Sequence, residues 1–160
     1  MSNVIFCYLR YVSLKYSKNV KKYRNELLLE QILLFLESSN LKLNKFDIES
    51  YIDEFEDVFM KSPIKEQGSG FGYNEGVFFY TILKIINPTV VIESGVMKGF
   101  TTYLIDAATN ENCRIYCYDI NLENNLFNSK KATYLNTDIT KNVPSMHNEK
   151  VVALWDDHTS

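Results

Sequence analysis

The feature that most constrains the fold is a pair of apolar runs, each ending in an acidic residue, with a glycine-containing turn after the first. The first run spans Val90 to Glu93 and leads into Gly95 and Gly99, and the second run ends at Asp119. Apolar strands separated by a helix-like segment are typical of a βαβ unit in a buried parallel sheet. Glycines let the backbone approach a ligand closely, and a carboxylate that ends a strand can accept hydrogen bonds from both ribose hydroxyls. The pattern therefore predicts a binding site of nucleotide type.

The rest of the second half of the chain continues this alternation. We expect a helix over 101–109 and strands over 114–119, 132–135 and 150–155. Near-continuous apolar strands separated by helices or loops indicate a sheet that is covered on both faces. The predicted fold class is therefore α/β, with a Rossmann-like, mostly parallel and partial sheet of about four strands.

The first part of the chain has a helical pattern. Residues 1–66 are expected to form a helical N-terminal cap, and residues 67–160 the Rossmann-like core. The spacing of apolar residues predicts one helix over 24–38 and a second helix that Asp47 caps. The second helix should end before Pro63, because proline disfavours the α conformation in the residue before it. The expected buried stripe of the first helix consists of Leu28, Ile32, Phe35 and Leu36, with Leu29 and Leu33 beside them.

A glycine-rich segment over 67–72 precedes a third helix, which should stop at Asn87 before a proline. In one interpretation this segment is a linker and Asn74 caps the helix. In the other it is a mobile loop over a bound ligand, with Tyr73 and Glu75 as contacts. The sequence alone leaves both interpretations open.

The composition limits the partners and the compartment. A net charge of -3 argues against a nucleic-acid partner, because phosphate contacts require a concentrated basic surface. No apolar run approaches the ~20 residues of a membrane-spanning helix, so we expect no membrane partner and a cytoplasmic location. Cys7, Cys113 and Cys117 lack metal-ligand spacing and are expected to be reduced thiols in that compartment.

The ordered series of acids and glycines resembles the class I S-adenosylmethionine-dependent methyltransferases. These enzymes have an acid and a glycine turn after the first strand, an acid that ends the second strand, an acid after the third, and an acidic cluster after the fourth. The resemblance implies S-adenosylmethionine as the cofactor. By this resemblance the cofactor-binding residues are Glu93, Ser94, Gly95 and Gly99 for the methionine portion, Asp119 for the ribose and Asp138 for the adenine, with Ile139 available to pack on the ring.

These residues also have structural explanations that need no ligand. Glu93 could cap a helix or pair with Lys98, and the glycines could belong to an unliganded turn. Asp138 closes an Asn-Thr-Asp sequence, which is ordinary turn chemistry. Met97 stands where the common family pattern has its middle glycine, and this is a departure from the pattern.

A second group of candidate residues follows the last predicted strand. Asp156 and Asp157 could hold Mg²⁺ through their oxygens, and Asp157 and His158 could serve catalysis, with His158 accepting a hydroxyl proton. The cluster resembles that of metal-assisted sugar and natural-product O-methyltransferases, which group with macrocin methyltransferases and cephalosporin hydroxylase-like proteins. The alternative is a polar chain end without a site.

The resemblance implies methyl transfer from S-adenosylmethionine to the hydroxyl of a small molecule, such as a sugar or a natural product, with Mg²⁺ as a possible second cofactor. The family's core continues through a fifth strand, so we expect a chain truncated after strand four. It is a fragment of a longer protein, a natural truncation that needs a partner to complete the sheet, or a chain that is no longer catalytic, and a homo-oligomer is the alternative to such a partner. The main alternative is a nonenzymatic remnant or interaction module. An NAD-dependent oxidoreductase fits less well, because the Gly-x-Gly-xx-Gly fingerprint is absent. Metal-dependent glycosyl transfer is a further alternative for the terminal cluster.

Overall fold

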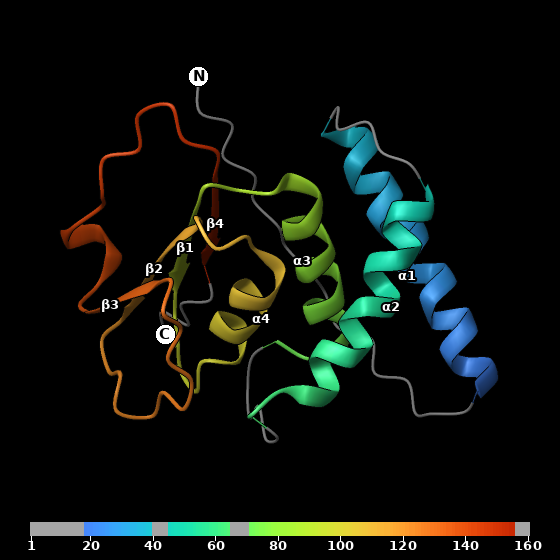
Figure 1. Cartoon of the computed structure of the whole chain (residues 1–160), viewed down its shortest axis with the longest axis horizontal. Coiled ribbons are helices and arrows are strands. Elements are labelled where there is room, and N and C mark those ends of the chain that lie inside the picture. The colour runs from blue at the N-terminus through green and yellow to red at the C-terminus, as the bar shows by residue number, and fades with distance from the viewer. Residues whose placement is uncertain (1–17, 40–44, 65–70, 156–160) are drawn as a thin grey trace.

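A parallel sheet lies at the centre of the structure, which is a computed structural model that describes residues 18–39, 45–64 and 71–155. Over these residues the chain forms a four-stranded sheet and four α-helices, and the helices lie on one side of the sheet (Figure 1). The fold class is therefore α/β, as the sequence predicts. In chain order the elements are α1 (Lys18–Ser38), α2 (Lys45–Lys61), α3 (Tyr73–Ile86), β1 (Val90–Ser94), α4 (Phe100–Ala108), β2 (Arg114–Asp119), β3 (Ala132–Asn136), the short 3-10 helix η1 (Ile139–Lys141) and β4 (Val151–Trp155).

The strand order is β3-β2-β1-β4, and all neighbouring strands are parallel. Glu93 is in register with Cys117 on β2 and with Leu154 on β4. The chain builds outward from β1 to β3 and then returns across β1 to form β4. The strand order therefore reverses between β1 and β4, and such a switch point is where open α/β sheets bind ligands, at the carboxyl ends of their strands.

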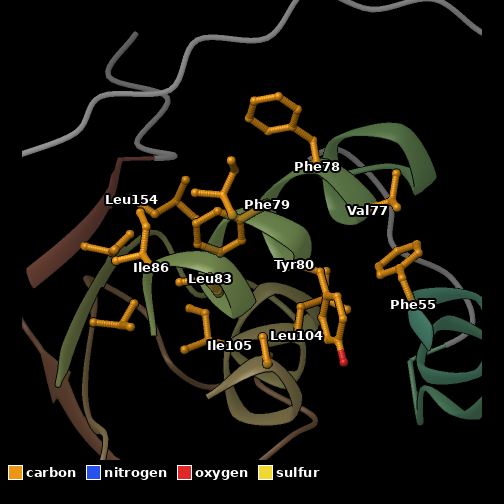
Figure 2. Close-up of a cluster of buried hydrophobic side chains, with 14 of the residues drawn as sticks. Phe55, Val77, Phe78, Phe79, Tyr80, Leu83, Ile86, Leu104, Ile105 and Leu154 are labelled. Atoms are coloured by element: carbon orange, nitrogen blue, oxygen red, sulfur yellow. The ribbon is translucent and has the colours of Figure 1, made fainter. Parts of the chain in front are cut away.

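One face of the sheet packs against α3 and α4. Figure 2 shows side chains of α3 between Leu154 of β4 on one side and Phe55 of α2 on the other. Every residue of α3 from Gly76 to Leu83 is buried. A helix that is apolar on all sides belongs inside a structure, so α3 is the central layer between the sheet and the outer helices.

The opposite face of the sheet has a thinner cover. Its core consists of Val90, Ile92, Tyr118 and Ile139, with half-buried neighbours such as Met146. The Tyr118 hydroxyl donates a 2.5 Å hydrogen bond to the Asn142 carbonyl, which holds the segment after η1 against the sheet. Ile139 is only 3% exposed, so our expectation that it would be available to an adenine ring was wrong.

The outer helices follow the predicted apolar pattern. Leu28, Leu29, Ile32 and Leu36 of α1 are buried, and Phe35 is half-buried against Phe78, with ring centroids 5.5 Å apart. The helix begins at Lys18, earlier than the predicted start. None of the helices in the described ranges is both long enough and apolar enough to cross a membrane.

Two predicted helix caps were wrong. The second helix begins at Lys45, so Asp47 lies inside its first turn, where a carboxylate interacts favourably with the helix dipole. The third helix begins at Tyr73 after Gly72, so Asn74 is already helical. The Glu75 carboxylate instead accepts the Gly72 N–H at 3.1 Å, which is half of a capping box.

Both predicted helix stops were confirmed. The second helix ends at Lys61, directly before Ser62 and Pro63. The third ends at Ile86, and its C-cap Asn87 is left-handed with φ 47° and donates its N–H to the Leu83 carbonyl at 2.8 Å. The glycine-rich segment largely lies outside the described residues, so the choice between linker and mobile loop stays open.

Candidate functional site

A tight turn connects β1 to α4 at the carboxyl edge of the sheet. Gly95, Met97 and Gly99 all have positive φ, at 94°, 51° and 83°. The Gly95 N–H donates to the Tyr118 carbonyl at 2.9 Å, which joins the turn to β2. Left-handed backbone costs little at glycine, but it is uncommon for methionine. The backbone therefore explains both glycines, and Met97 adopts an uncommon conformation between them.

Asp119 at the end of β2 binds this turn directly. Its Oδ2 accepts the N–H groups of Val96 and Met97 at 2.8 and 2.9 Å, and its Oδ1 accepts the N–H of Asn121 at 2.8 Å. A carboxylate has about four acceptor positions, and these three bonds leave about one for a ligand. The acid that we expected to hold both ribose hydroxyls can therefore accept one of them without rearrangement.

A loop after β2 closes over the turn at Gly99. A side chain at this position would place its Cβ 2.2 Å from the Asn125 Oδ1, which is closer than real contacts allow. Asn125 is itself held, because its Oδ1 accepts the Phe127 N–H at 3.1 Å. The close approach of this loop therefore requires a glycine at position 99, whether or not a ligand binds.

Glu93 is fully buried on the face of the sheet that α4 covers. Its Oε2 accepts a 2.6 Å hydrogen bond from the Thr102 hydroxyl of α4 and a 3.3 Å bond from the Cys117 thiol of β2. Burial raises the pKa of the Cys117 thiol far above its ordinary value, and the neighbouring Glu93 carboxylate raises it further. We call these three residues the inner cluster. The cluster links β1, α4 and β2 next to the turn.

Apolar side chains are exposed at the same edge of the sheet. Met97 in the turn is 44% exposed, Ile120 directly after β2 is 79% exposed, and Trp155 at the end of β4 is 51% exposed. Ser94, which is buried, is in register between Tyr118 and Trp155. Apolar surface beside a few fixed polar groups is the usual composition of a small-molecule site.

Asp138 lies farther along the edge, after β3. Its Oδ1 accepts the N–H and the hydroxyl of Thr140 at 2.7 and 2.6 Å, so it caps η1. The Thr140 hydroxyl, followed by the Thr140 N–H, lowers the pKa of this partly exposed carboxyl below its ordinary value. This is the turn chemistry that the sequence left open, and the role of Asp138 beside adenine stays a prediction.

The structure brings five predicted residues together around the turn: Glu93, Ser94, Gly95, Gly99 and Asp119. The predicted metal ligands Asp156 and Asp157 and the predicted base His158 lie outside the described residues. Within the described ranges no group of three or more His, Cys, Asp or Glu side chains has a geometry suited to a metal ion.

Sequence reasoning missed Thr102 and Cys117, although two signals could have identified them. Pairing the first residues of the two parallel strands, Val90 and Arg114, places Glu93 and Cys117 side by side, and residues in register share one face. Thr102 lies in the first turn of the following helix, which must pack on that same face. A buried acid there requires donors, and these were the nearest candidates.

No protein-family model matches the chain, and a search of curated proteins finds no match either. Three features of the described residues point to a ligand-binding function. These are the left-handed turn after β1, the carboxylate of Asp119 bound to it, and the apolar side chains exposed beside them.

Proposed function

We propose that this chain binds S-adenosylmethionine at the carboxyl ends of β1 and β2 and catalyses methyl transfer to the hydroxyl of a small molecule. One observation supports this most strongly: the acid that ends β2 is hydrogen-bonded to a left-handed glycine turn after β1. Open α/β sheets bind ligands outside the carboxyl ends of their strands, where this turn and this acid lie. The turn after β1 and Asp119 fit an adenosine group, because the glycines of the turn leave its backbone accessible and the Asp119 carboxylate can accept one more hydrogen bond.

The chain's own residues have distinct tasks in this proposal. Asp119 accepts a ribose hydroxyl, and Ile120 offers its exposed side chain to the adenine ring. When bound, S-adenosylmethionine supplies an electrophilic methyl group on its sulfonium. Glu93 has no exposed surface, so we assign it to positioning the turn through the inner cluster and not to direct contact with the cofactor.

We assign removal of the acceptor's proton to His158 and retention of Mg²⁺ to Asp156 and Asp157. These assignments depend on the sequence resemblance alone. A His158→Ala variant should lower turnover by about 10²–10⁴-fold if this imidazole is the general base. Full activity of that variant in the presence of a chelator would remove both the base and the metal from the mechanism.

A nonenzymatic interaction module is the second candidate, and specific contacts favour it. Asp119 already accepts three backbone N–H groups, and Asn125 accounts for the glycine at position 99. Both features would be present in a fold that had lost its ligand. Binding experiments therefore separate the two candidates more directly than any further structural argument.

Isothermal titration calorimetry with S-adenosylhomocysteine tests the proposal, with NAD as the competing ligand. We expect S-adenosylhomocysteine to bind and Asp119→Ala to weaken binding by about tenfold to a hundredfold, the scale of a hydrogen bond to a charged group. Glu123→Ala is the matched control, because it removes an exposed carboxylate from the same loop. Tight binding of NAD, or no binding of S-adenosylhomocysteine or S-adenosylmethionine by the folded chain, would overturn the proposal.

A further inference from the structure

The two outer strands of the sheet differ in character. Among the described residues, β3 and β4 each have a neighbouring strand on one side only. The sequence of β3, Ala-Thr-Tyr-Leu-Asn, is partly polar, and its Thr133 and Asn136 are exposed. The sequence of β4, Val-Val-Ala-Leu-Trp, contains no charged residue and no proline. An apolar strand edge without such residues is prone to pair with a further strand, so β4 lacks the usual protection of an outer strand.

Both faces of β4 are covered. Val152 and Leu154 belong to the core on the side of α3 and are 4% and 6% exposed. Val151 and Ala153 are half-buried and pack against the core on the opposite face. Burial on both faces is typical of an interior strand of a parallel sheet. The side chains of β4 therefore fit an interior position better than the outer position that it has among the described strands.

The backbone of β4 presents regularly spaced hydrogen-bonding groups along this edge. The Val90 N–H donates to the Lys150 carbonyl at 3.2 Å, and Val90 is in register with Val151. Successive residues of a strand direct their N–H and C=O groups alternately to opposite sides. The backbone groups of Val152 therefore face β1, whereas those of Val151 and Ala153 face away from the sheet. These outward groups have the geometry that a further strand requires.

An apolar run near the start of the chain has the composition of such a strand. Residues 4–9, which lie outside the described residues, read Val-Ile-Phe-Cys-Tyr-Leu and contain no charge, glycine or proline. β-Branched and aromatic residues are enriched in strands, and about six residues is a usual strand length. Arg10 follows the run directly. We call residues 4–9 the N-terminal run.

Helix α1, which follows the N-terminal run in the chain, has its first part at the carboxyl edge of the sheet. The Arg24 guanidinium lies 4.0 Å from the centroid of the Tyr73 ring, so this part of α1 lies beside the start of α3. The Phe59 ring contacts both Tyr73 and Phe100, with centroids 5.0 and 5.8 Å apart. Phe100 is the first residue of α4, directly after the turn that leaves β1. The starts of α3 and α4 and the first part of α1 therefore lie on one side of the molecule.

The chain between the N-terminal run and α1 is long enough to reach β4. Lys18 begins α1 and is nine residues beyond Leu9, a distance that an extended chain spans up to about 32 Å. From the sheet to α3 and from α3 to α1, the layers are each separated by about 10 Å. A run parallel to β4 ends at the carboxyl edge, on the side where α1 begins. An antiparallel run would lengthen the path by about 17 Å, the length of a five-residue strand, so the parallel orientation fits better.

We propose that the N-terminal run pairs with the outer edge of β4, parallel to it, as a fifth strand of the sheet. The outward N–H and C=O groups of Val151 and Ala153 then form hydrogen bonds within the chain. A segment tethered in this way has an effective concentration of about millimolar, which favours it over the same edge of a second copy. The added strand also makes β4 the interior strand that its buried faces indicate.

Amide hydrogen exchange of the whole 160-residue chain, followed by NMR, tests the pairing. We expect the N–H groups of Val151 and Ala153 to be protected. Because N–H groups alternate along a strand, either Phe6→Pro or Cys7→Pro removes a bond to β4, and that variant should speed their exchange by about tenfold or more. Ser13→Pro is the matched control, because it lies between the run and α1. Fast exchange in the unsubstituted chain, or equal effects of all three variants, would overturn the proposal.

Cross-strand nuclear Overhauser effects in the unsubstituted chain identify the partner of β4, even if the proline variants fail to fold. We expect contacts between the two strands to run in the same order, with Val4 near Val151 and Leu9 near Trp155. A mixture of labelled and unlabelled chains separates contacts within one chain from contacts between two. Contacts of β4 with a second copy, with another segment, or in the reverse order would contradict the inference.

Discussion

Glu93 and Asp119 are acids near the carboxyl ends of neighbouring strands, but Glu93 is fully buried whereas Asp119 is partly exposed. Side chains donate to Glu93, namely a hydroxyl of α4 and a thiol of β2. Backbone N–H groups donate to Asp119. The comparison separates an interior acid that holds three elements together from an edge acid that shapes a turn and can still reach a ligand.

Burial decides how much each hydrogen bond matters. In the interior a carboxylate that loses a donor has no water to replace it, whereas water can replace a donor at the edge. We therefore expect substitutions in the inner cluster to change the free energy of unfolding strongly. Substitutions at the edge should change ligand binding more than stability.

The largest effect is expected for Thr102→Val, which removes the 2.6 Å donor to Glu93 and keeps the size of the side chain. Loss of a hydrogen bond to a buried charged group should lower the free energy of unfolding by about 2–3 kcal/mol. Urea denaturation measures this change. An unchanged midpoint would mean that the carboxylate does not depend on this hydroxyl.

Thr81→Val is the matched control and should have the opposite sign. Thr81 is also fully buried, but its hydroxyl has no hydrogen-bond partner among the described residues. Replacing an unsatisfied buried hydroxyl by a methyl group should therefore raise the free energy of unfolding by about 1 kcal/mol. Equal destabilisation by both variants would mean that packing, and not hydrogen bonding, governs these sites.

The second effect is a loss of stability in alkali. The pKa of Cys117 is raised in the folded chain, so the folded state keeps a proton that the unfolded thiol releases near its ordinary value of 9.0. Stability is thus fully present below pH 9 and falls above it, by at most about 1.4 kcal/mol per pH unit for one thiol. Above pH 9, Cys117→Ser should lower by about one the number of protons that the chain releases on unfolding. The fall in the free energy of unfolding with pH should therefore be less steep. Among the described residues, the slope that remains belongs to Cys113, Tyr80, Tyr103, Tyr118 and Tyr134, whose pKa values are also raised by burial.

The sequence predicts the sheet well because each strand is a short and mostly apolar run. The bounds of β2 were predicted without error, and those of β1, β3, β4 and α4 within one residue. The caps were harder, because Glu75 replaced Asn74 as the capping side chain through a contact three residues away. Glu93 shows the main limit, since its donors come from two other elements and depend on the strand register.

The third effect concerns the edge acid. Asp119→Asn keeps one acceptor oxygen but removes the charge that three backbone N–H groups bind. Because the site is partly exposed, water can replace the lost interactions, and we expect a cost of about 1 kcal/mol. Thermal unfolding beside Thr102→Val measures the contrast. A larger loss for Asp119→Asn than for Thr102→Val would reverse the comparison between interior and edge.

The smallest effect is expected at Asp138, which lies at the same edge and is partly exposed. Its pKa is lowered first by the Thr140 hydroxyl and then by the Thr140 N–H, so its contribution to stability is present above the ordinary value of 3.8 and is lost as the pH falls through the lower folded value. In Thr140→Val only the N–H bond remains, and the pKa should move part of the way back toward 3.8. Carboxyl carbon shifts followed by NMR from pH 2 to 6 measure it, with Thr133→Val on exposed β3 surface as the control. A pKa that ignores Thr140→Val would mean that the hydroxyl does not bind the carboxylate in solution. A change in the Asp138 pKa in Thr140→Val and not in Thr133→Val would show that the contribution of this edge to stability changes in acid. The contribution of Cys117 in the interior changes in alkali instead.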